Sequence, residues 1–219
     1  VILETKEGQY RISMPGERIG VKKLESVLDV LHALVRENDT VVVSGSLPSG
    51  VSPDFYTGVV FTLKQWGVTV YFDADGDKLL AGLIGQPDYI KPNLHEFQRL
   101  IDKEISNVTE MIEQAERIIS IYGLKGILLT LGGKGAYYIS LDKTLYTASV
   151  KVPVKSAVGA GDSFLAAFAL KKSEGASDEE ALKWANAAGA AAVMTPGTML
   201  CRKEDVEELL KVITVDTLI

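Results

Sequence analysis

Cysteine is nearly absent from this chain of 219 residues, because Cys201 is its only one. An intrachain disulfide is therefore impossible, and a reducing, cytoplasmic setting fits that composition. Long apolar runs are missing too, since none reaches the roughly 18 residues that a membrane-spanning helix needs. The chain begins Val-Ile-Leu, with no recognisable signal peptide. We therefore expect no membrane partner.

Positive charge is in short supply as well. Lys and Arg number 23 against 29 Asp and Glu, which gives a net charge of −6. No Lys/Arg cluster supplies the basic face that nucleic acid binding requires, so that class of partner is excluded. One or two local cations could still hold a small anionic substrate. The length suits a single sizeable domain.

Apolar β-branched runs alternate with segments of helical spacing along the chain. This alternation predicts an α/β fold with a mostly parallel sheet and helices on both faces. Residues 41–43, a continuous valine run, are expected to form a strand buried on both faces. Capping patterns at Asn107 and Ser177, each followed three residues later by Glu, mark two helix starts. Further strands are expected at 68–72, 89–90 and 127–131, hairpins at 1–12 and 136–149, and helices at 24–36, 53–66, 94–101, 107–122, 163–171, 177–194 and 205–212.

Four predicted strands end in polar or glycine-rich segments. Ser44-Gly45-Ser46 follows the first, Asp73 the second, Lys91-Pro92-Asn93 the third and Gly132-Gly133 the fourth. In open α/β sheets, ligands bind at the carboxyl ends of the strands. We therefore expect the active site at this edge.

Residues 158–163, Val-Gly-Ala-Gly-Asp-Ser, open an apolar helix. Small residues allow several N–H groups to point at one anion, and a helix start favours negative charge. That arrangement suits a phosphoryl group in transfer. Asp162, in the first turn, could accept the proton of an attacking hydroxyl. The other interpretation, a glycine turn with aspartate as a helix cap, stays open on spacing alone.

This segment resembles the second signature of the ribokinase/PfkB carbohydrate kinase family. Four other segments resemble that family in the same order: VVSGSLPSG at 42–50, KPNLHEF at 91–97, TLGGKG at 130–135 and GTMLC at 197–201. The closest likeness is to its sugar-phosphate branch, 1-phosphofructokinase and tagatose-6-phosphate kinase. The resemblance implies a three-layer α/β/α ribokinase-like fold and an ATP-dependent sugar-phosphate kinase.

The resemblance also implies a role for individual residues, with ATP as phosphoryl donor and Mg²⁺ as metal. Asp162 would be the catalytic base, and the amides of Gly159, Ala160 and Gly161 would bind the transferred phosphoryl group. Asn93 and Glu96 match the family's N-x-x-E element, which would organise the metal. The nucleotide would lie along Thr130, Gly132, Gly133, Gly135, Asn186 and Gly197, and the sugar phosphate beside Gly45, Ser46 and Lys91.

Each of these residues also has a plainer interpretation. Asn93 and Glu96 fit a helix-capping box, which is compatible with a metal role. Gly132-Gly133 fits a simple turn, Gly45-Ser46 an ordinary loop, and Lys91 and Asn186 fit exposed surface positions. Other nucleotide motifs fail: Val51 replaces the lysine of a P-loop, and Phe164 interrupts a dinucleotide fingerprint.

The expected reaction is phosphorylation of a ketohexose phosphate, with fructose 1-phosphate first and tagatose 6-phosphate second. The family's first, substrate-binding signature is absent from the chain, so the N-terminal part of the fold is expected to be missing. Residues 1–14 resemble part of the lid that covers the sugar and forms a homodimer, and residues 15–219 the nucleotide-binding and catalytic domain. A non-catalytic ATP-binding fragment remains the alternative.

Overall fold

The computed structural model describes residues 2–5, 8–11 and 16–218. A small antiparallel hairpin pairs β1 (Ile2–Thr5) with β2 (Gly8–Arg11). The predicted hairpin at 1–12 therefore forms, although residues 1, 6–7 and 12 lie outside the described part. The larger sheet contains β3 (Thr40–Ser44), β4 (Thr69–Asp73), β5 (Tyr89–Ile90), β6 (Gly126–Thr130), β7 (Ala136–Ile139), β8 (Thr144–Thr147) and β9 (Asp216–Thr217). The helices are α1 (Val21–Leu34), α2 (Asp54–Gln65), α3 (Asp77–Ile84), α4 (Leu94–Leu100), α5 (Val108–Tyr122), α6 (Ala160–Ser173), α7 (Asp178–Val193) and α8 (Lys203–Leu210).

The strands of the large sheet lie in the same order as in the chain, from β3 to β9. The pairs from β3 to β6 are parallel, and those from β6 to β9 are antiparallel. Since β8 returns to the direction of β3–β6, only β7 and β9 run the other way. The predicted mostly parallel sheet is confirmed.

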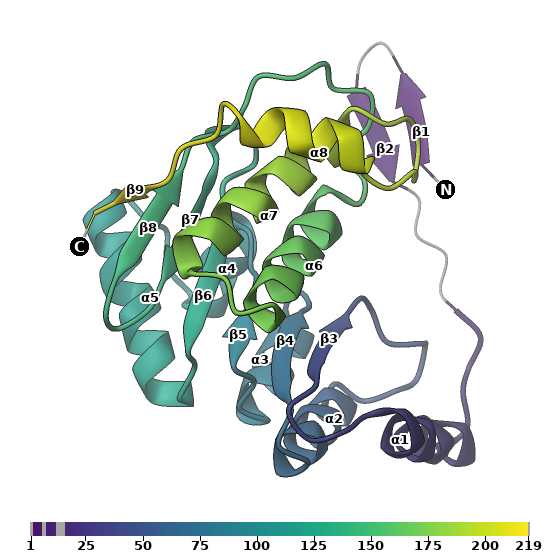
Figure 1. The fold of residues 1–219 in the computed structure, drawn as a ribbon. Helices are drawn as coiled ribbons and strands as arrows, with labels where there is room; N and C mark the ends of the chain where they lie inside the picture. Colours follow the sequence, from purple (N-terminus) through teal and green to yellow (C-terminus); the bar gives the residue numbers. More distant parts are fainter. Residues whose placement is uncertain (1, 6–7, 12–15, 219) are drawn as a thin grey trace.

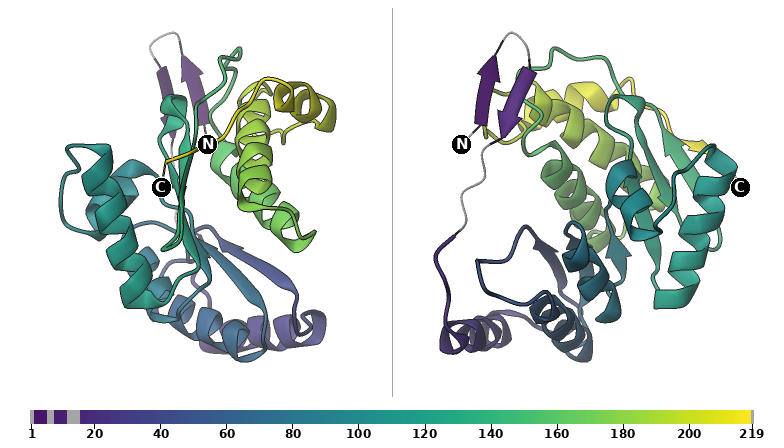
Figure 2. Two further views of the ribbon diagram at one scale, coloured as in Figure 1. Left: turned by 60° about the vertical axis from the view of Figure 1, so that its left-hand side comes forward. Right: turned by 180° about the vertical axis from the view of Figure 1, so that it is seen from behind.

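Helices cover both faces of this sheet, which gives three layers (Figure 1). Strands added in chain order with right-handed crossovers place their connecting helices on one face. Accordingly α2, α3, α4 and α5 pack on one side, and the α6–α7 hairpin packs on the other, as the edge-on view shows (Figure 2). The three-layer α/β/α prediction is confirmed.

The two helical layers enclose separate apolar cores. Phe72, Phe97 and Leu129 are fully buried on the α2–α5 side, and Phe168 and Leu128 on the α6–α7 side. Close approach between α6 and α7 depends on Gly189. A Cβ there would lie 3.3 Å from the carbonyl oxygen of Ala160 and 3.5 Å from Cβ of Phe164. The two helices therefore pack tightly at the start of α6.

The prediction for residues 41–43 was partly wrong. Val41 and Val43 pack against the α2–α5 core, but Val42 is 42% exposed on the other face. In the part of the chain that the structure describes, β3 has a neighbour on one side only, β4. A strand in that position is not covered on both faces, so the continuous valine run did not indicate complete burial.

Asp88 anchors the other end of the sheet, just before β5. Its carboxylate is 3% exposed, accepts a 2.8 Å hydrogen bond from the Val70 amide, and pairs with Lys64 at 2.6 Å and Lys125 at 3.0 Å. Burial alone would raise the pKa of Asp88, but the hydrogen bonds from Lys64, Val70 and Lys125 together lower it below its usual 3.8.

We expect Asp88→Ala to lower the free energy of unfolding by roughly 2 kcal/mol at pH 7, because the Val70 amide loses its partner. A carboxylate whose pKa is lowered by folding stabilises the folded protein at pH values above its unfolded pKa. This stabilisation is lost as the pH falls through the folded pKa. The difference from wild type should therefore narrow as the pH falls below the usual aspartate pKa of 3.8. Urea unfolding at several pH values measures it, and a pH-independent difference would contradict the prediction.

Candidate active site at the start of α6

The first turn of α6 lies within residues 158–163, the segment for which the sequence predicted an anion-binding turn. Gly159 precedes the helix with a left-handed φ of 77°, which a non-glycine residue adopts only at a cost. Its carbonyl oxygen accepts the Ser163 amide at 2.8 Å, so the helical turn closes directly over Ala160 and Gly161. The early amides of a helix have no intrahelical acceptor, which leaves them available to an anion.

Asp162 extends from this turn toward the end of β3. Its side chain is exposed, and its Oδ1 accepts a long hydrogen bond of 3.4 Å from the Ser44 hydroxyl. Ser44 ends β3, and no role was predicted for its side chain. The bond joins residues 118 positions apart in the chain. It places the predicted base at the carboxyl edge of the sheet, where ligands of this fold class bind.

Lys91 is buried beside the same turn. The surface position expected for a lysine was wrong, because Lys91 is 6% exposed. Its Nζ lies 3.1 Å from Asp73 Oδ2 and would lie 3.2 Å from a Cβ at Gly161. Burial raises the pKa of Asp73, Lys91 opposes that rise, and the charge of Asp162 adds to it. Two carboxylates and one ammonium thus share the space under the start of α6.

Asn93 and Glu96 form the capping box at the start of α4. Asn93 Oδ1 accepts the Glu96 amide at 2.9 Å, and Glu96 Oε2 accepts the Asn93 amide at 2.8 Å. The cap uses one oxygen of the Glu96 carboxylate. Mg²⁺ is commonly held by one or two carboxylates together with waters and substrate phosphates, so these residues fit such an ion. In the described part of the chain, no cluster of three or more His, Cys, Asp or Glu suggests a closed metal cage.

The loop after β6 joins the same edge. Thr130 ends β6 and bridges to Asn93. Gly132 and Gly133 are exposed in a short 3-10 turn, and a Cβ at either would meet nothing within 4 Å. Open space around this backbone lets a ligand approach closely. Gly135, by contrast, is buried with φ 101°, and a Cβ there would lie 2.0 Å from the Thr147 carbonyl oxygen.

We expect Gly135→Ala to lower the free energy of unfolding by roughly 3 kcal/mol, because the backbone conformation is strained for alanine and the new methyl group overlaps β8. Gly123→Ala is the matched control. Gly123 has φ 68°, but a Cβ there would meet nothing within 4 Å, so it should cost only about 1 kcal/mol. Thermal or urea unfolding compares the two, and equal losses would contradict the argument.

Asn186 links α7 to the end of β8. It is buried rather than on the surface, and its Nδ2 donates 2.8 Å hydrogen bonds to Thr147 Oγ1 and to the Ala148 carbonyl oxygen. This side chain therefore fixes the strand against which Gly135 packs. Its bonds are structural, and any contact with a nucleotide stays a prediction.

Two predicted residues have no hydrogen bond to this cluster in the described part of the chain. They are Gly197 and Ser46, and both lie in exposed loops. The Gly197 loop is nevertheless anchored, since the Thr195 hydroxyl is buried 2.8 Å from the Ala192 carbonyl oxygen and 2.7 Å from that of Met199. Gly45, next to Ser46, is tied to the site through its amide, which donates to the Asp73 carbonyl oxygen at 3.2 Å.

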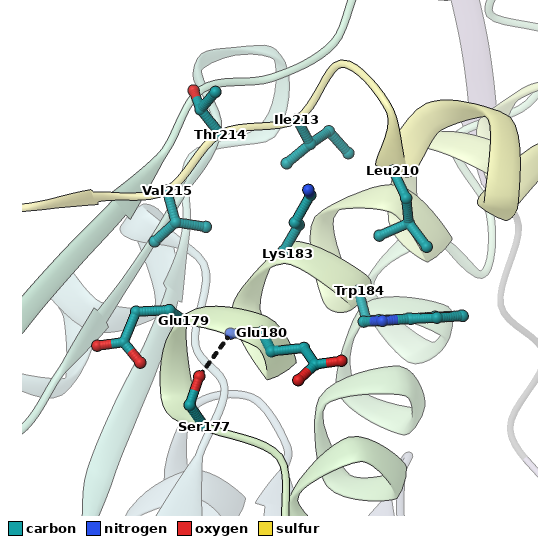
Figure 3. Close-up of a pocket in the computed structure, with 9 residues that line it drawn as sticks. All are labelled: Ser177, Glu179, Glu180, Lys183, Trp184, Leu210, Ile213, Thr214 and Val215. Carbon is teal, nitrogen blue, oxygen red and sulfur yellow. Dashed lines mark hydrogen bonds between the residues drawn. The ribbon is translucent and has the colours of Figure 1, made fainter.

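A surface hollow of about 600 Å³ lies elsewhere, between Ser177, Glu180 and Trp184 near the start of α7 and a segment that contributes Leu210, Ile213, Thr214 and Val215 (Figure 3). Asp162 is in the first turn of α6, whereas Ser177 follows the far end of that helix. The helix spans about 16 Å from Asp162 to its last residue, Ser173, so the start of α7 is distant from Asp162. The hollow is not the site that the sequence predicts.

The sequence model of the pfkB family carbohydrate kinases matches residues 1–205. The chain belongs to the pfkB carbohydrate kinase family. Some of the relatives that match this chain are named as ATP-dependent enzymes. The chain is 31% identical over 214 residues to the ATP-dependent 6-phosphofructokinase isozyme 2 of Escherichia coli, 30% over 207 residues to the 1-phosphofructokinase of Vibrio cholerae, and 32% over 212 residues to the tagatose-6-phosphate kinase of Staphylococcus epidermidis.

Solved structures of phosphofructokinases show the same fold. Phosphofructokinase-2 from Escherichia coli, in complex with substrates and products, superposes with a TM-score of 0.89 at 29% identity. That match covers 96% of this chain and 69% of the other. Against the three curated relatives, the alignments cover 94–95% of this chain but only 65–68% of their lengths. The ribokinase-like fold is confirmed, and about a third of each relative has no counterpart here.

Proposed function

We propose that this pfkB family chain transfers the γ-phosphoryl group of ATP to a hydroxyl group of a ketohexose phosphate. The observation that carries the proposal is the juxtaposition at the start of α6. There the Asp162 carboxylate lies beside the Gly159–Gly161 amides, and the buried Lys91 ammonium lies beside Gly161. A general base next to an anion-binding turn is what phosphoryl transfer to an alcohol requires.

In this reaction the sugar hydroxyl oxygen forms a bond to the γ-phosphorus, and the bond from that phosphorus to the bridging oxygen of ADP breaks. Asp162 takes the hydroxyl proton and later releases it to solvent. The amides of Gly159, Ala160 and Gly161 and the ammonium of Lys91 stabilise the negative charge on the transferred group. The amides are fixed by the backbone and the Lys91 ammonium by burial, so these groups need little reorganisation.

The order of the strands suggests where each substrate lies. Gly45 and Ser46 follow β3 at one end of the site, and Thr130, Gly132, Gly133 and Gly135 follow or flank β6 toward the other. Three strand spacings separate these ends by about 14 Å. We place the sugar phosphate on the β3 side and the nucleotide along β6–β8, with Asn186 and Gly197 on the nucleotide side. Mg²⁺ bound near Asn93 and Glu96 would neutralise phosphate charge.

The substrate is tested by a coupled ADP-release assay on the natural protein that carries this sequence. Fructose 1-phosphate, tagatose 6-phosphate and fructose 6-phosphate are presented separately, because the relatives named above act on different sugar phosphates. We expect the highest kcat/KM with fructose 1-phosphate. Preference for either of the other sugars would correct the substrate and leave the reaction class standing. No ADP release with any sugar phosphate would overturn the function.

A second proposal concerns residues 1–14, as a lid segment that also forms a homodimer. The β1–β2 hairpin is the described part of that segment. Deleting residues 1–14 should convert a dimer into a monomer in light scattering.

If this 219-residue chain binds ATP but releases no ADP while the natural protein turns over, the chain alone is a non-catalytic fragment.

A further inference from the structure

Asp73 and Lys91 form an ion pair. The proposed reaction gives a role to Lys91 but none to Asp73. The two residues lie at the ends of neighbouring strands, because Asp73 ends β4 and Lys91 comes directly after β5. Their charged atoms are 3.1 Å apart, and their side chains are 16% and 7% exposed. Burying a charge is costly, and a buried pair often gives no net stability over apolar residues. Stability alone is therefore a weak reason for the pair.

The position of Asp73 is fixed by its backbone. Its carbonyl oxygen accepts the Gly45 amide, and it lies opposite Ser44 in the β3–β4 register. Lys91 is anchored in the same way, through its amide, which donates to the Phe72 carbonyl oxygen at 3.2 Å. The lysine side chain beyond that anchor is long and has four rotatable bonds, so its ammonium needs a partner to hold one place.

The place that Asp73 selects is directly under the first turn of α6. The Lys91 ammonium would lie 3.2 Å from a Cβ at Gly161. A second acceptor, the carboxylate of Asp162, extends from the next residue of the same turn. The charge of Asp162 contributes to raising the pKa of Asp73, so the two carboxylates are near enough to interact. Without Asp73, Asp162 would offer the ammonium another anionic partner at the same turn.

We propose that Asp73 is a positioning residue, which holds the Lys91 ammonium under Gly161, at the anion-binding turn, and keeps it from pairing with Asp162. The inference rests on the proposed function, since it concerns the same site. Asp73 touches neither substrate in this arrangement and acts through Lys91. Its loss would misplace the buried ammonium of Lys91, which would then pair with the Asp162 base.

The first test compares Asp73→Asn with Asp75→Asn in the steady-state assay. Asp75 receives the same chemical change two residues later, but it is 55% exposed and pairs with Arg99 instead. We expect Asp73→Asn to lower kcat on the order of 10-fold, with KM for ATP changed less than about threefold, because misplaced catalytic groups affect the transition state more than binding. Asp75→Asn should match wild type.

The second test is a double-mutant cycle with Lys91→Met, with folding checked by thermal unfolding. If Asp73 acts through Lys91, adding Asp73→Asn to Lys91→Met should change kcat by less than about threefold. The neutral double variant also leaves no unpaired buried charge, so it remains informative where a single variant fails to fold. Full additivity of the two changes would overturn the inference, as would a normal kcat in Asp73→Asn. Absence of ADP release by the wild-type protein would instead overturn the proposed function.

Discussion

Replacing Asp162 with asparagine is expected to lower kcat by on the order of 10²-fold or more, while the affinity for ATP stays nearly unchanged. Asparagine has almost the same shape and can still accept the hydrogen bond from Ser44, which reaches Oδ1 at 3.4 Å in the structure. It cannot take the proton of an attacking hydroxyl. The side chain is exposed at the start of α6, so the substitution should leave the fold intact.

The measurement pairs the coupled ADP-release assay with calorimetric titration of ATP. Asp29→Asn is the matched control, because Asp29 is an exposed carboxylate on α1, which lies away from α6 (Figure 1). Near-normal turnover by Asp162→Asn would reject Asp162 as the base. A parallel loss of ATP affinity would instead show that the carboxylate organises the nucleotide.

Gly161→Val should lower kcat by on the order of 10²-fold through the loss of the anion-binding turn, since removing one such donor group has effects of that size. Gly161 is helical, with no left-handed φ, so the backbone accepts valine. The added Cβ would lie 3.2 Å from the Lys91 ammonium, so the valine side chain would crowd that cation beneath the amides of the turn. The effect should therefore fall on catalysis and not on folding.

Gly58→Val provides the comparison. Gly58 lies in the middle of α2, and a Cβ there would meet nothing within 4 Å. Valine in place of glycine within a helix should leave stability within about 1 kcal/mol of wild type in both variants. Turnover is then compared at equal folded fraction, by circular dichroism and ADP release. Equal turnover in the two variants would show that the amides near Gly161 do not meet the phosphate.

The sequence predicted the parallel half of the sheet and the site edge because both depend on local patterns. Valine- and isoleucine-rich runs identified β3 to β6, and the capping residues Asn107 and Ser177 marked the starts of α5 and α7. Helix starts and strand ends are set by nearby residues, so the polar segments after four strands could be placed at one edge. That edge is where Ser44, Lys91 and Asp162 now meet.

Helix α3 was not predicted, because it includes a glycine and lies between glycines. Gly82 weakens a helix by its own propensity. In the structure a Cβ at Gly82 would lie 2.1 Å from the Phe72 ring, so the glycine is required by contact between α3 and β4. Contacts between elements are not visible in a local pattern. The two-residue strand β9 was missed for the same reason, since it forms only by pairing with β8.

The burial of Lys91 and Asn186 could not be inferred from their residue types, which usually lie on the surface. Lys91 is buried because Asp73 compensates its charge, and Asn186 because Thr147 and Ala148 accept its amide hydrogens. Asp73 ends β4, whereas Thr147 and Ala148 lie at the end of β8, so the partners are distant from Lys91 and Asn186 in the chain. Only the folded sheet brings these partners within reach, so the pairing could not be predicted from the sequence alone.

The glycine contact at position 189 also determines how movement would pass between the two halves of the site. Because Gly189 has no side chain, α7 packs closely against Ala160. The amide of Ala160 belongs to the proposed anion-binding turn. Packed interiors transmit displacement because they contain little free volume. A nucleotide that shifted α7 or the loop after it would therefore push on the phosphoryl-binding turn directly, through van der Waals contact across the helix pair.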